Sequence, residues 1–346
     1  MAAELTLDSQ AMFEATAGLP EQVALAAEAA RGIDNLPDRS SIEHVVVLGM
    51  GGSGVAGDIL AATAATFMAV PVTVVKSYEL PHFVGEGSLV FAMSCSGDTE
   101  ETIETASEAA VQGAHVIAVC GGGELARLAK GWGSAVIPVP DTIPQPRAAL
   151  GAMSIPPLVV LEEIGLFTGA TQWIDLAIGQ LQRRRDRLVR DNNDAQAIAR
   201  RIGRTIPLIH GGGLLGSAAA MRWKTQVNEN AKSPAFWAAQ PELCHNEIVG
   251  WGQHGDATRQ LITAVMLRHD HEHPQVSRRF DIVAEIMSEV VASIEQVHAE
   301  GEGELAQLLD LILVGDFVSL YLADQEGLDP GPVPLLGEIK DKLAAG

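Results

Sequence analysis

Cysteine is scarce in this chain of 346 residues: only Cys95, Cys120 and Cys244 occur, and no two of them form a CxxC pair. An odd number of scattered cysteines favours neither a disulfide framework nor a cysteine-based zinc site, so we expect a reducing compartment, the cytoplasm. No charged segment followed by an apolar one opens the sequence, and an apolar stretch such as residues 155–161 is far shorter than the roughly 20 residues of a membrane span. We therefore expect neither export nor membrane insertion.

Basic residues are also few, because 23 Lys and Arg stand against 44 Asp and Glu, which gives a formal net charge of -21 at pH 7. This balance argues against the broad basic surface that binds nucleic acid or anionic membranes. A small anion can still bind at a local site. Apolar residues, in contrast, make up 47% of the chain, and a chain of this length can bury two cores.

Short runs rich in β-branched residues alternate with longer segments rich in Ala and Leu, which is typical of βαβ units around a parallel sheet. We predict an α/β protein of two doubly wound αβα lobes with parallel sheets, residues 1–170 and 171–346. The first lobe is expected to have strands at 44–48, 70–76, 88–93, 114–119 and 134–138 and helices at 55–67, 100–112 and 123–130. After a largely helical stretch at 148–202, the second is expected to have strands at 206–210 and 261–267 and helices at 214–232 and 304–325.

A glycine cluster follows the first expected strand, and the same order of strand, glycines and helix recurs at 207–216, as in a repeated unit. Gly49, Gly51 and Gly54 satisfy G-x-G-x-x-G, the dinucleotide-binding fingerprint. However, the next strand ends at Lys76 and not at the acidic residue that a ribose requires. The cluster therefore has two interpretations, an NADP-like site or a tight turn that lets helix and sheet pack closely.

The segment "SCSGDTEET" places the hydroxyls of Ser94, Ser96 and Thr99 between a buried strand and the start of a helix. Unpaired backbone N–H groups and the positive end of the helix dipole favour an anion there, even without Lys or Arg. A phosphate monoester fits this description. The alternative is an ordinary helix cap, with Asp98 or Thr99 as the capping residue.

Five segments of the chain, taken together, follow the order and spacing of a known family: "GMGGSGVAGD" (49–58), "SCSGDTEET" (94–102), "PRAALG" (146–151), "NENAKSPAF" (228–236) and "PELCHNEIVGW" (241–251). They resemble the bifunctional phosphoglucose/phosphomannose isomerases, two-lobed members of the sugar isomerase (SIS) superfamily, from about residue 40 to the C-terminus. The resemblance implies an aldose-ketose isomerase that interconverts glucose 6-phosphate and/or mannose 6-phosphate with fructose 6-phosphate through an enediol, with no metal or other cofactor. It also implies a homodimer with shared active sites.

The same resemblance implies where the substrate binds. The first lobe would hold both the phosphate and the sugar, and the second lobe would carry the base and the ring-opening residue. The expected phosphate ligands are Ser94, Ser96 and Thr99, and the residues expected to line the sugar are Gly51, Gly52 and Ser53.

Proton transfer between C2 and C1 of an open-chain sugar requires a carboxylate base, and the resemblance assigns this role to Glu229. Arg147 is the matching cation that would stabilise the enediolate. His245, of a residue type that titrates near neutral pH, matches the ring-opening histidine. Lys340 matches a lysine near the sugar ring, although Lys342 is close enough to leave that alignment open.

Each of these residues also has an ordinary interpretation. Glu229 and Lys232 have the i, i+3 spacing of an ion pair on a helix surface. His245 can be a loop histidine, and Arg147 a surface cation beside a proline. The alternating histidines of "RHDHEH" (268–273) suggest either a metal cluster or, as we prefer, a solvated loop.

The chain departs from the family pattern at Cys95, which replaces an aromatic residue, at Asp98, which replaces Asn, and at Gly331, which replaces Thr. Asp98 adds negative charge near the expected phosphate and weakens binding unless its side chain turns away to cap its helix. Gly331 is expected to border the sugar, where the change would alter the choice between epimers. Two further classes stay open, an NADP-linked oxidoreductase and a non-catalytic sugar-phosphate sensor, although Glu229 and His245 count against a sensor because a sensor needs no base.

Overall fold

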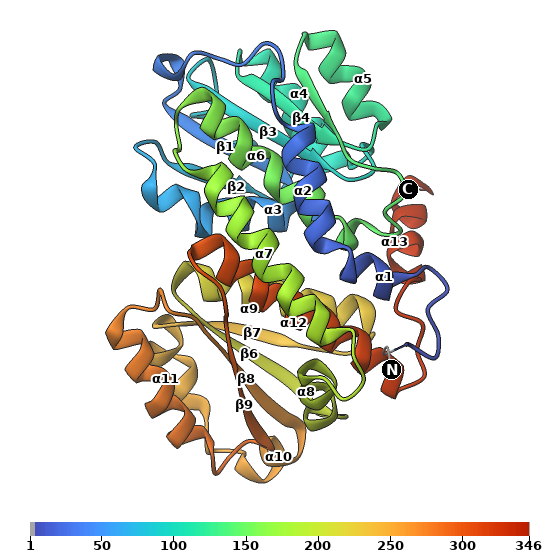
Figure 1. Ribbon diagram of the computed structural model, residues 1–346, viewed down its shortest axis with the longest axis vertical. Coiled ribbons are helices and arrows are strands. Elements are labelled where there is room, and N and C mark those ends of the chain that lie inside the picture. Colours follow the sequence, from blue (N-terminus) through green and yellow to red (C-terminus); the bar gives the residue numbers. More distant parts are fainter. Residues whose placement is uncertain (1–3, 346) are drawn as a thin grey trace.

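The computed structural model describes residues 4–345. They form two sheets, each built of parallel strands, which lie one above the other along the long axis in Figure 1. The first sheet has the strand order β2-β1-β3-β4-β5, and the second has the order β7-β6-β8-β9. Every strand pairing within both sheets is parallel. The predicted α/β class with two doubly wound parallel sheets is therefore confirmed.

The first sheet is covered on both faces, which explains why its strands are nearly continuous apolar runs. Helices α2, α3 and α6 pack on one face, and helices α4 and α5 pack on the other. The strands are β1 (His44–Gly49), β2 (Val72–Val75), β3 (Ser88–Ser94), β4 (His115–Cys120) and β5 (Ala135–Pro138). The helices are α2 (Leu19–Ala29), α3 (Gly51–Ala62), α4 (Glu100–Val111), α5 (Gly123–Trp132) and α6 (Leu150–Ile164).

The second sheet is covered by α8, α9 and α12 on one face and by α11 on the other. Its strands are β6 (Ile206–Gly212), β7 (Phe236–Gln240), β8 (Ile262–Arg268) and β9 (Ser293–His298). The helices are α8 (Asp194–Ile202), α9 (Gly213–Asn230), α10 (Gly255–Leu261), α11 (Pro274–Met287) and α12 (Glu304–Gln325).

Helix α12 is the central helix of the second lobe and has the bounds predicted from the sequence. It is also long and apolar enough to cross a membrane, since an 18-residue window within its 22 residues has a mean hydropathy of 1.7. The uninterrupted apolar runs within this helix nevertheless stay short, because Asp310 and Asp316 interrupt them. That window is completely buried, and the helix packs against α7 (Ala170–Leu188), α8 and α9, so its apolar character serves the protein core.

Several elements differ from the prediction. The helix expected at 55–67 begins at Gly51 and ends at Ala62, and the separate 3-10 helix η2 (Ala64–Phe67) follows. The edge strands β7 and β9 were not predicted, because each is short and only partly buried and depends on its neighbour for pairing. Helices α1 (Met12–Ala17), α2, α10, α11 and α13 (Pro334–Ala345) were not predicted either.

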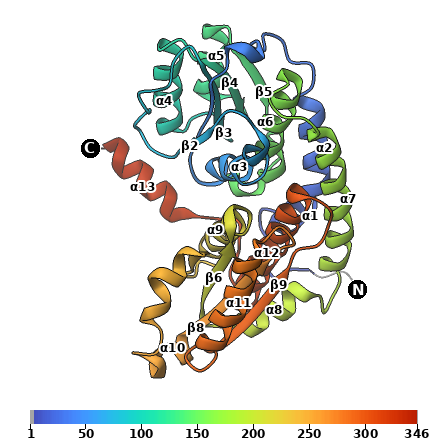
Figure 2. The same ribbon diagram turned by 90° about the vertical axis from the view of Figure 1, so that its left-hand side faces the viewer.

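The lobes are joined by long helices. In Figure 1, α7 runs from the upper lobe to the lower one, and it packs against α2 and α12. Figure 2 shows α13 as an arm that projects from the second lobe beside the first. The division of the chain into lobes at residues 170 and 171 stays a prediction.

The close contact of α12 with α9 generates a stability prediction. A Cβ added at Gly315 of α12 would overlap the indole ring of Trp223, which is fully buried on α9 and donates its Nε1–H to the Leu311 carbonyl. Gly315→Ala should therefore lower the free energy of unfolding in urea by about 3 kcal/mol. Gly131→Ala in α5 is the matched control, because a Cβ there has open space. A Gly315→Ala protein as stable as the control would contradict this packing.

Candidate active site

The carboxyl edge of the first sheet brings two loops together. Strands β1 and β3 are neighbours, with Gly49 beside Met93, so their following loops start side by side. Ser53, buried in the first turn of α3, accepts a hydrogen bond at 3.3 Å from the backbone N–H of Cys95. A Cβ at Gly52 would lie 3.1 Å from the Pro146 carbonyl oxygen, so a glycine lets α3 approach that segment closely. The sequence-predicted glycines and the hydroxyl loop are thus adjacent.

The hydroxyls of the "SCSGDTEET" loop are organised by one another. The Oγ of buried Ser94 lies 2.8 Å from the Oγ1 of Thr99 and accepts a bond from the N–H of Gly97. Ser96 is exposed and accepts from the N–H of Asp98. Thr99 is the N-cap residue of α4, but no side chain caps the helix. The first-turn N–H groups of α4 therefore remain available to an anion.

The carboxylate of Asp98 turns away from this position. Its Oδ1 accepts a hydrogen bond of 2.9 Å from the N–H of Glu124, in the first turn of the neighbouring helix α5. The prediction that Asp98 caps its own helix was wrong. In both arrangements, however, the carboxylate is bonded to a helix N-terminus and not directed at the expected phosphate. The negative charge is used at a second helix N-terminus, where it is favourable.

Arg147 is buried in the short 3-10 helix η3 (Pro146–Ala148), with 2% of its surface exposed, so its interpretation as a surface cation was wrong. Its donors reach several separate segments. Nε donates to the Asn230 side chain at 2.7 Å, and Nη2 donates to the carbonyls of Pro330 and Gly331 at 2.6 and 2.7 Å. Nη1 donates to Gln145 at 3.2 Å. These bonds fix the guanidinium plane in one orientation.

Glu229 meets Arg147 from the last turn of α9. Its Oε2 lies 3.5 Å from Nη1 of Arg147, and its side chain is 29% exposed. Burial lowers the pKa of Arg147, and the Glu229 carboxylate opposes that shift. The ion pair suggested for Glu229 and Lys232 was wrong, because Lys232 donates instead to the backbone carbonyls of Glu229 and Pro330, at 2.6 and 2.9 Å.

A second buried arginine supports this arrangement. Arg222 of α9 makes a bidentate pair with Asp316 of α12, at 3.0 and 2.7 Å, and also donates to the Arg147 carbonyl at 2.6 Å. Sequence reasoning missed Arg222, Asn230 and Gln145 as part of the site. Asn230 lies within the quoted "NENAK" segment, but nothing in the sequence alone indicates which residues surround a buried guanidinium.

The remaining candidates lie on separate elements. Lys340 of α13 lines a groove of about 470 Å³ together with Asp98, Thr99, Glu100 and Glu101. Lys342, in contrast, pairs with Glu338 on its own helix. His245 ends the 3-10 helix η4 (Glu242–His245) and is exposed. Within residues 4–345, no hydrogen bond or ion pair joins His245 to the other candidates. The structure thus brings together the glycines, hydroxyls, Arg147 and Glu229, and it leaves His245 apart.

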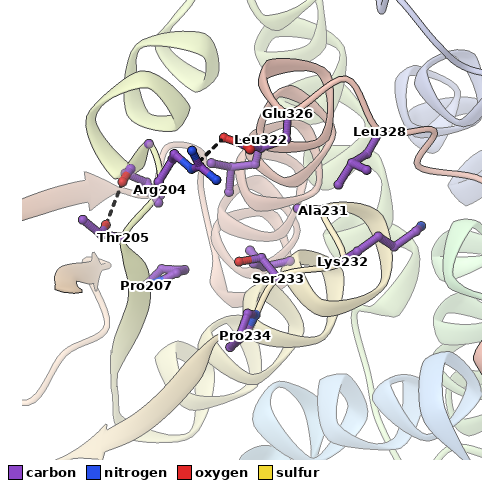
Figure 3. Close-up of a pocket in the computed structure, with 13 residues that line it drawn as sticks. Arg204, Thr205, Pro207, Ala231, Lys232, Ser233, Pro234, Leu322, Glu326 and Leu328 are labelled. Atoms are coloured by element: carbon purple, nitrogen blue, oxygen red, sulfur yellow. Dashed lines mark hydrogen bonds and ion pairs between the residues drawn. The ribbon is translucent and has the colours of Figure 1, made fainter.

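Another pocket, of about 320 Å³, lies behind the last turn of α9 (Figure 3). It is lined by Lys232 and Ser233 together with the loop before β6, where Arg204 turns toward Glu326 at 3.7 Å. This pocket therefore lies at the amino ends of the strands of the second sheet. Ligands of doubly wound folds bind at the carboxyl ends of the strands, so we place the candidate site at the first-sheet edge.

The contacts of Lys76 and Gly54 bear on the dinucleotide interpretation. Lys76 is paired with Asp58. A Cβ at Gly54 would lie 2.7 Å from the Gly49 carbonyl oxygen, which gives this glycine a packing role.

Among the described residues no group of three His, Cys, Asp or Glu side chains is arranged to hold a metal, and His271 of the "RHDHEH" run faces Glu304 at 3.3 Å.

Comparison with known proteins identifies the relatives of this chain. Residues 191–343 match the model of the bacterial phospho-glucose isomerase C-terminal SIS domain, and residues 40–132 match the SIS domain. A bifunctional phosphoglucose/phosphomannose isomerase of Caldicellulosiruptor bescii is 36% identical over 337 residues, covering 96% of this chain and 99% of that protein. Its Aquifex aeolicus counterpart is 32% identical and covers 90% and 93%.

Solved structures share the fold at low sequence identity. The C-terminal domain of glucosamine-fructose-6-phosphate aminotransferase from Francisella tularensis has a TM-score of 0.70 at 16% identity, covering 92% of this chain and 96% of that one. A glucose-6-phosphate isomerase like protein from Thermus thermophilus has a TM-score of 0.59 at 21% identity, covering 94% and 96%. Given its sequence relatives and the two SIS-type units, the chain belongs to the bifunctional phosphoglucose/phosphomannose isomerase family.

Proposed function

We propose that the protein interconverts glucose 6-phosphate and/or mannose 6-phosphate with fructose 6-phosphate, as the names of its relatives suggest. The observation that carries the proposal is the pair of Glu229 and buried Arg147, 3.5 Å apart. Gly52 packs against the Arg147 segment, and the next residue, Ser53, accepts a hydrogen bond from the hydroxyl loop. A carboxylate base, a fixed cation and an anion site are what an enediol isomerisation of a sugar phosphate needs.

The phosphate would bind at Ser94, Ser96 and Thr99 and at the uncapped N-terminus of α4. This site contains no Lys or Arg of its own loop, and hydroxyl and backbone donors suffice for a phosphate at a helix N-terminus. Lys340 lines the same groove as Thr99 and would add a cation beside the sugar or its phosphate. The sugar would lie against Gly51, Gly52 and Ser53, toward Arg147.

In this arrangement Glu229 would take the proton from C2 and return it at C1, or the reverse. Arg147 would stabilise the negative charge that develops on the enediolate oxygens. Its guanidinium is already held by bonds to Asn230, Pro330 and Gly331, so it needs little reorganisation as the charge develops. No metal or cofactor takes part in this scheme.

We further propose a cytoplasmic homodimer in which His245 opens the sugar ring in the partner's site. The exposed position of His245 supports a role in trans. Apolar side chains are also exposed on β7 and along one side of α13, a feature of surfaces that associate: Phe236, Leu335, Ile339 and Leu343.

Glu229→Gln should lower kcat by about 10²- to 10⁴-fold, because the base is lost while the size of the side chain is kept. Binding of 5-phosphoarabinonate, measured by calorimetry, should change little, since the hydroxyl loop is untouched. Glu302→Gln, at an exposed position, is the matched control and should be fully active. If Glu229→Gln retained most of its kcat, Glu229 would not be the base.

Activity toward glucose 6-phosphate should survive exhaustive EDTA treatment, because Arg147 and not a Lewis acid stabilises the enediolate in this scheme. The measurement is the isomerase rate before and after chelation. Loss of activity with EDTA and its return with zinc would revive the histidines at 268–273 as metal ligands.

Subunit mixing tests the shared site. Glu229→Gln and His245→Ala homodimers should each be inactive, but after unfolding and refolding together about half of the dimers should be mixed. Each mixed dimer would have one site with both lesions and one intact site, so activity should return to about a quarter of the wild-type value. If both residues act within one chain, verified mixed dimers will remain as inactive as their parents.

A further inference from the structure

Gly331 leaves space that the side chain of Gln10 occupies. A Cβ at Gly331 would lie 2.8 Å from both Cβ and Oε1 of Gln10 and 2.9 Å from its Cδ. Gly331 does not have the positive φ that favours glycine, so its backbone conformation would tolerate a side chain. It is the presence of Gln10 that excludes one. The Gly331 carbonyl itself accepts a hydrogen bond from Arg147.

Gln10 is linked to Arg147 through a second amide. Its Oε1 accepts from Nε2 of Gln145 at 2.7 Å, and Oε1 of Gln145 accepts from Nη1 of Arg147 at 3.2 Å. Because a guanidinium can only donate, the direction of both bonds is determined by Arg147. Nη1 is also the nitrogen that faces Glu229, so the two amides hold the reactive edge of the guanidinium.

The segment that carries Gln10 is itself anchored beside Gly331. The carboxylate of Asp329 accepts from the N–H of Ser9 at 3.3 Å and from the N–H of Gly331 at 3.0 Å. On the other side of Gln10, Asp8 accepts from the N–H groups of Met12 and Phe13, in the first turn of α1, at 2.7 and 2.9 Å. The position of Gln10 is therefore defined by bonds on both sides.

We propose that Gln10 is a positioning residue that keeps the Nη1 edge of Arg147 directed at the enediolate. The proposal rests on the isomerase function. When Glu229 takes a proton it becomes neutral and attracts Arg147 less. The amide oxygen of Gln145 still accepts a hydrogen bond from Nη1 of Arg147 at that point, and Gln10 holds this amide in place. The N-terminal segment, which lies outside the motifs that indicated the function, thereby becomes part of the active site.

Gln10→Met and Gln145→Met keep the length of each side chain and remove the link. Each should lower kcat for glucose 6-phosphate by about 2- to 10-fold, the worth of one hydrogen bond, with a smaller change in KM. The double variant should lose no more than Gln145→Met alone, because Gln10 acts through Gln145. Gln112→Met, at the exposed end of α4, is the matched control. Losses that multiply in the double variant, or a Gln10→Met protein as active as the control, would overturn the proposal.

A readout without turnover separates this proposal from the isomerase assignment. Nitrogen-15 NMR of Arg147 should show slow rotation about the Cζ–Nη1 bond in the wild type and faster rotation about that bond in Gln10→Met, because the bonds of Nε and Nη2 are unchanged. Thermal unfolding is the check that both proteins are folded. Guanidinium signals that do not differ between the two proteins would overturn the positioning role. A wild-type protein that isomerises neither hexose 6-phosphate would instead refute the proposed function, while the NMR comparison would still decide the role of Gln10.

Discussion

The burial of one guanidinium constrains much of the structure. An arginine with 2% of its surface exposed needs hydrogen-bond acceptors around it, because an unpaired buried charge costs several kcal/mol. Arg147 obtains them from the end of α9 and from the segment after α12, and its own carbonyl is held by the Arg222 and Asp316 pair. The contacts that satisfy this charge also join the two lobes. The geometry of the candidate site and the packing of the lobes thus depend on the same residues.

The proposed phosphate site would let an acidic protein hold an anionic substrate. A net charge of -21 opposes phosphate binding at long range, so attraction must come from groups close to the ligand. The uncapped start of α4 and the linked hydroxyls of Ser94 and Thr99 provide such groups. Asp98 carries a negative charge in this loop, which would repel a phosphate, but its carboxylate is bonded to the start of α5.

Much of the fold could be predicted because parallel strands covered on both faces are apolar runs. The central strands β1, β3, β4, β6 and β8 and helix α12 were predicted within two residues at each end. The edge strands β7 and β9 could not be predicted in this way, because their pairing is decided by a neighbour that is distant in sequence. The start of α3 at Gly51 was also missed, since three glycines among the four residues 51–54 favour a loop, and the contacts of this turn with β1 and the Arg147 segment make it helical.

The sequence by itself determined the α/β class and the residue types of the candidate site, because alternating apolar runs and spaced motifs are local properties of the chain. It could not show that Glu229 faces Arg147 and not Lys232, because helical spacing predicts neighbours only along the same helix. Nor could it show that Gln10 fills the space over Gly331, more than 300 residues away in sequence. Tertiary structure decided both, since a buried charge and a missing side chain are each compensated by whichever groups the fold brings within reach.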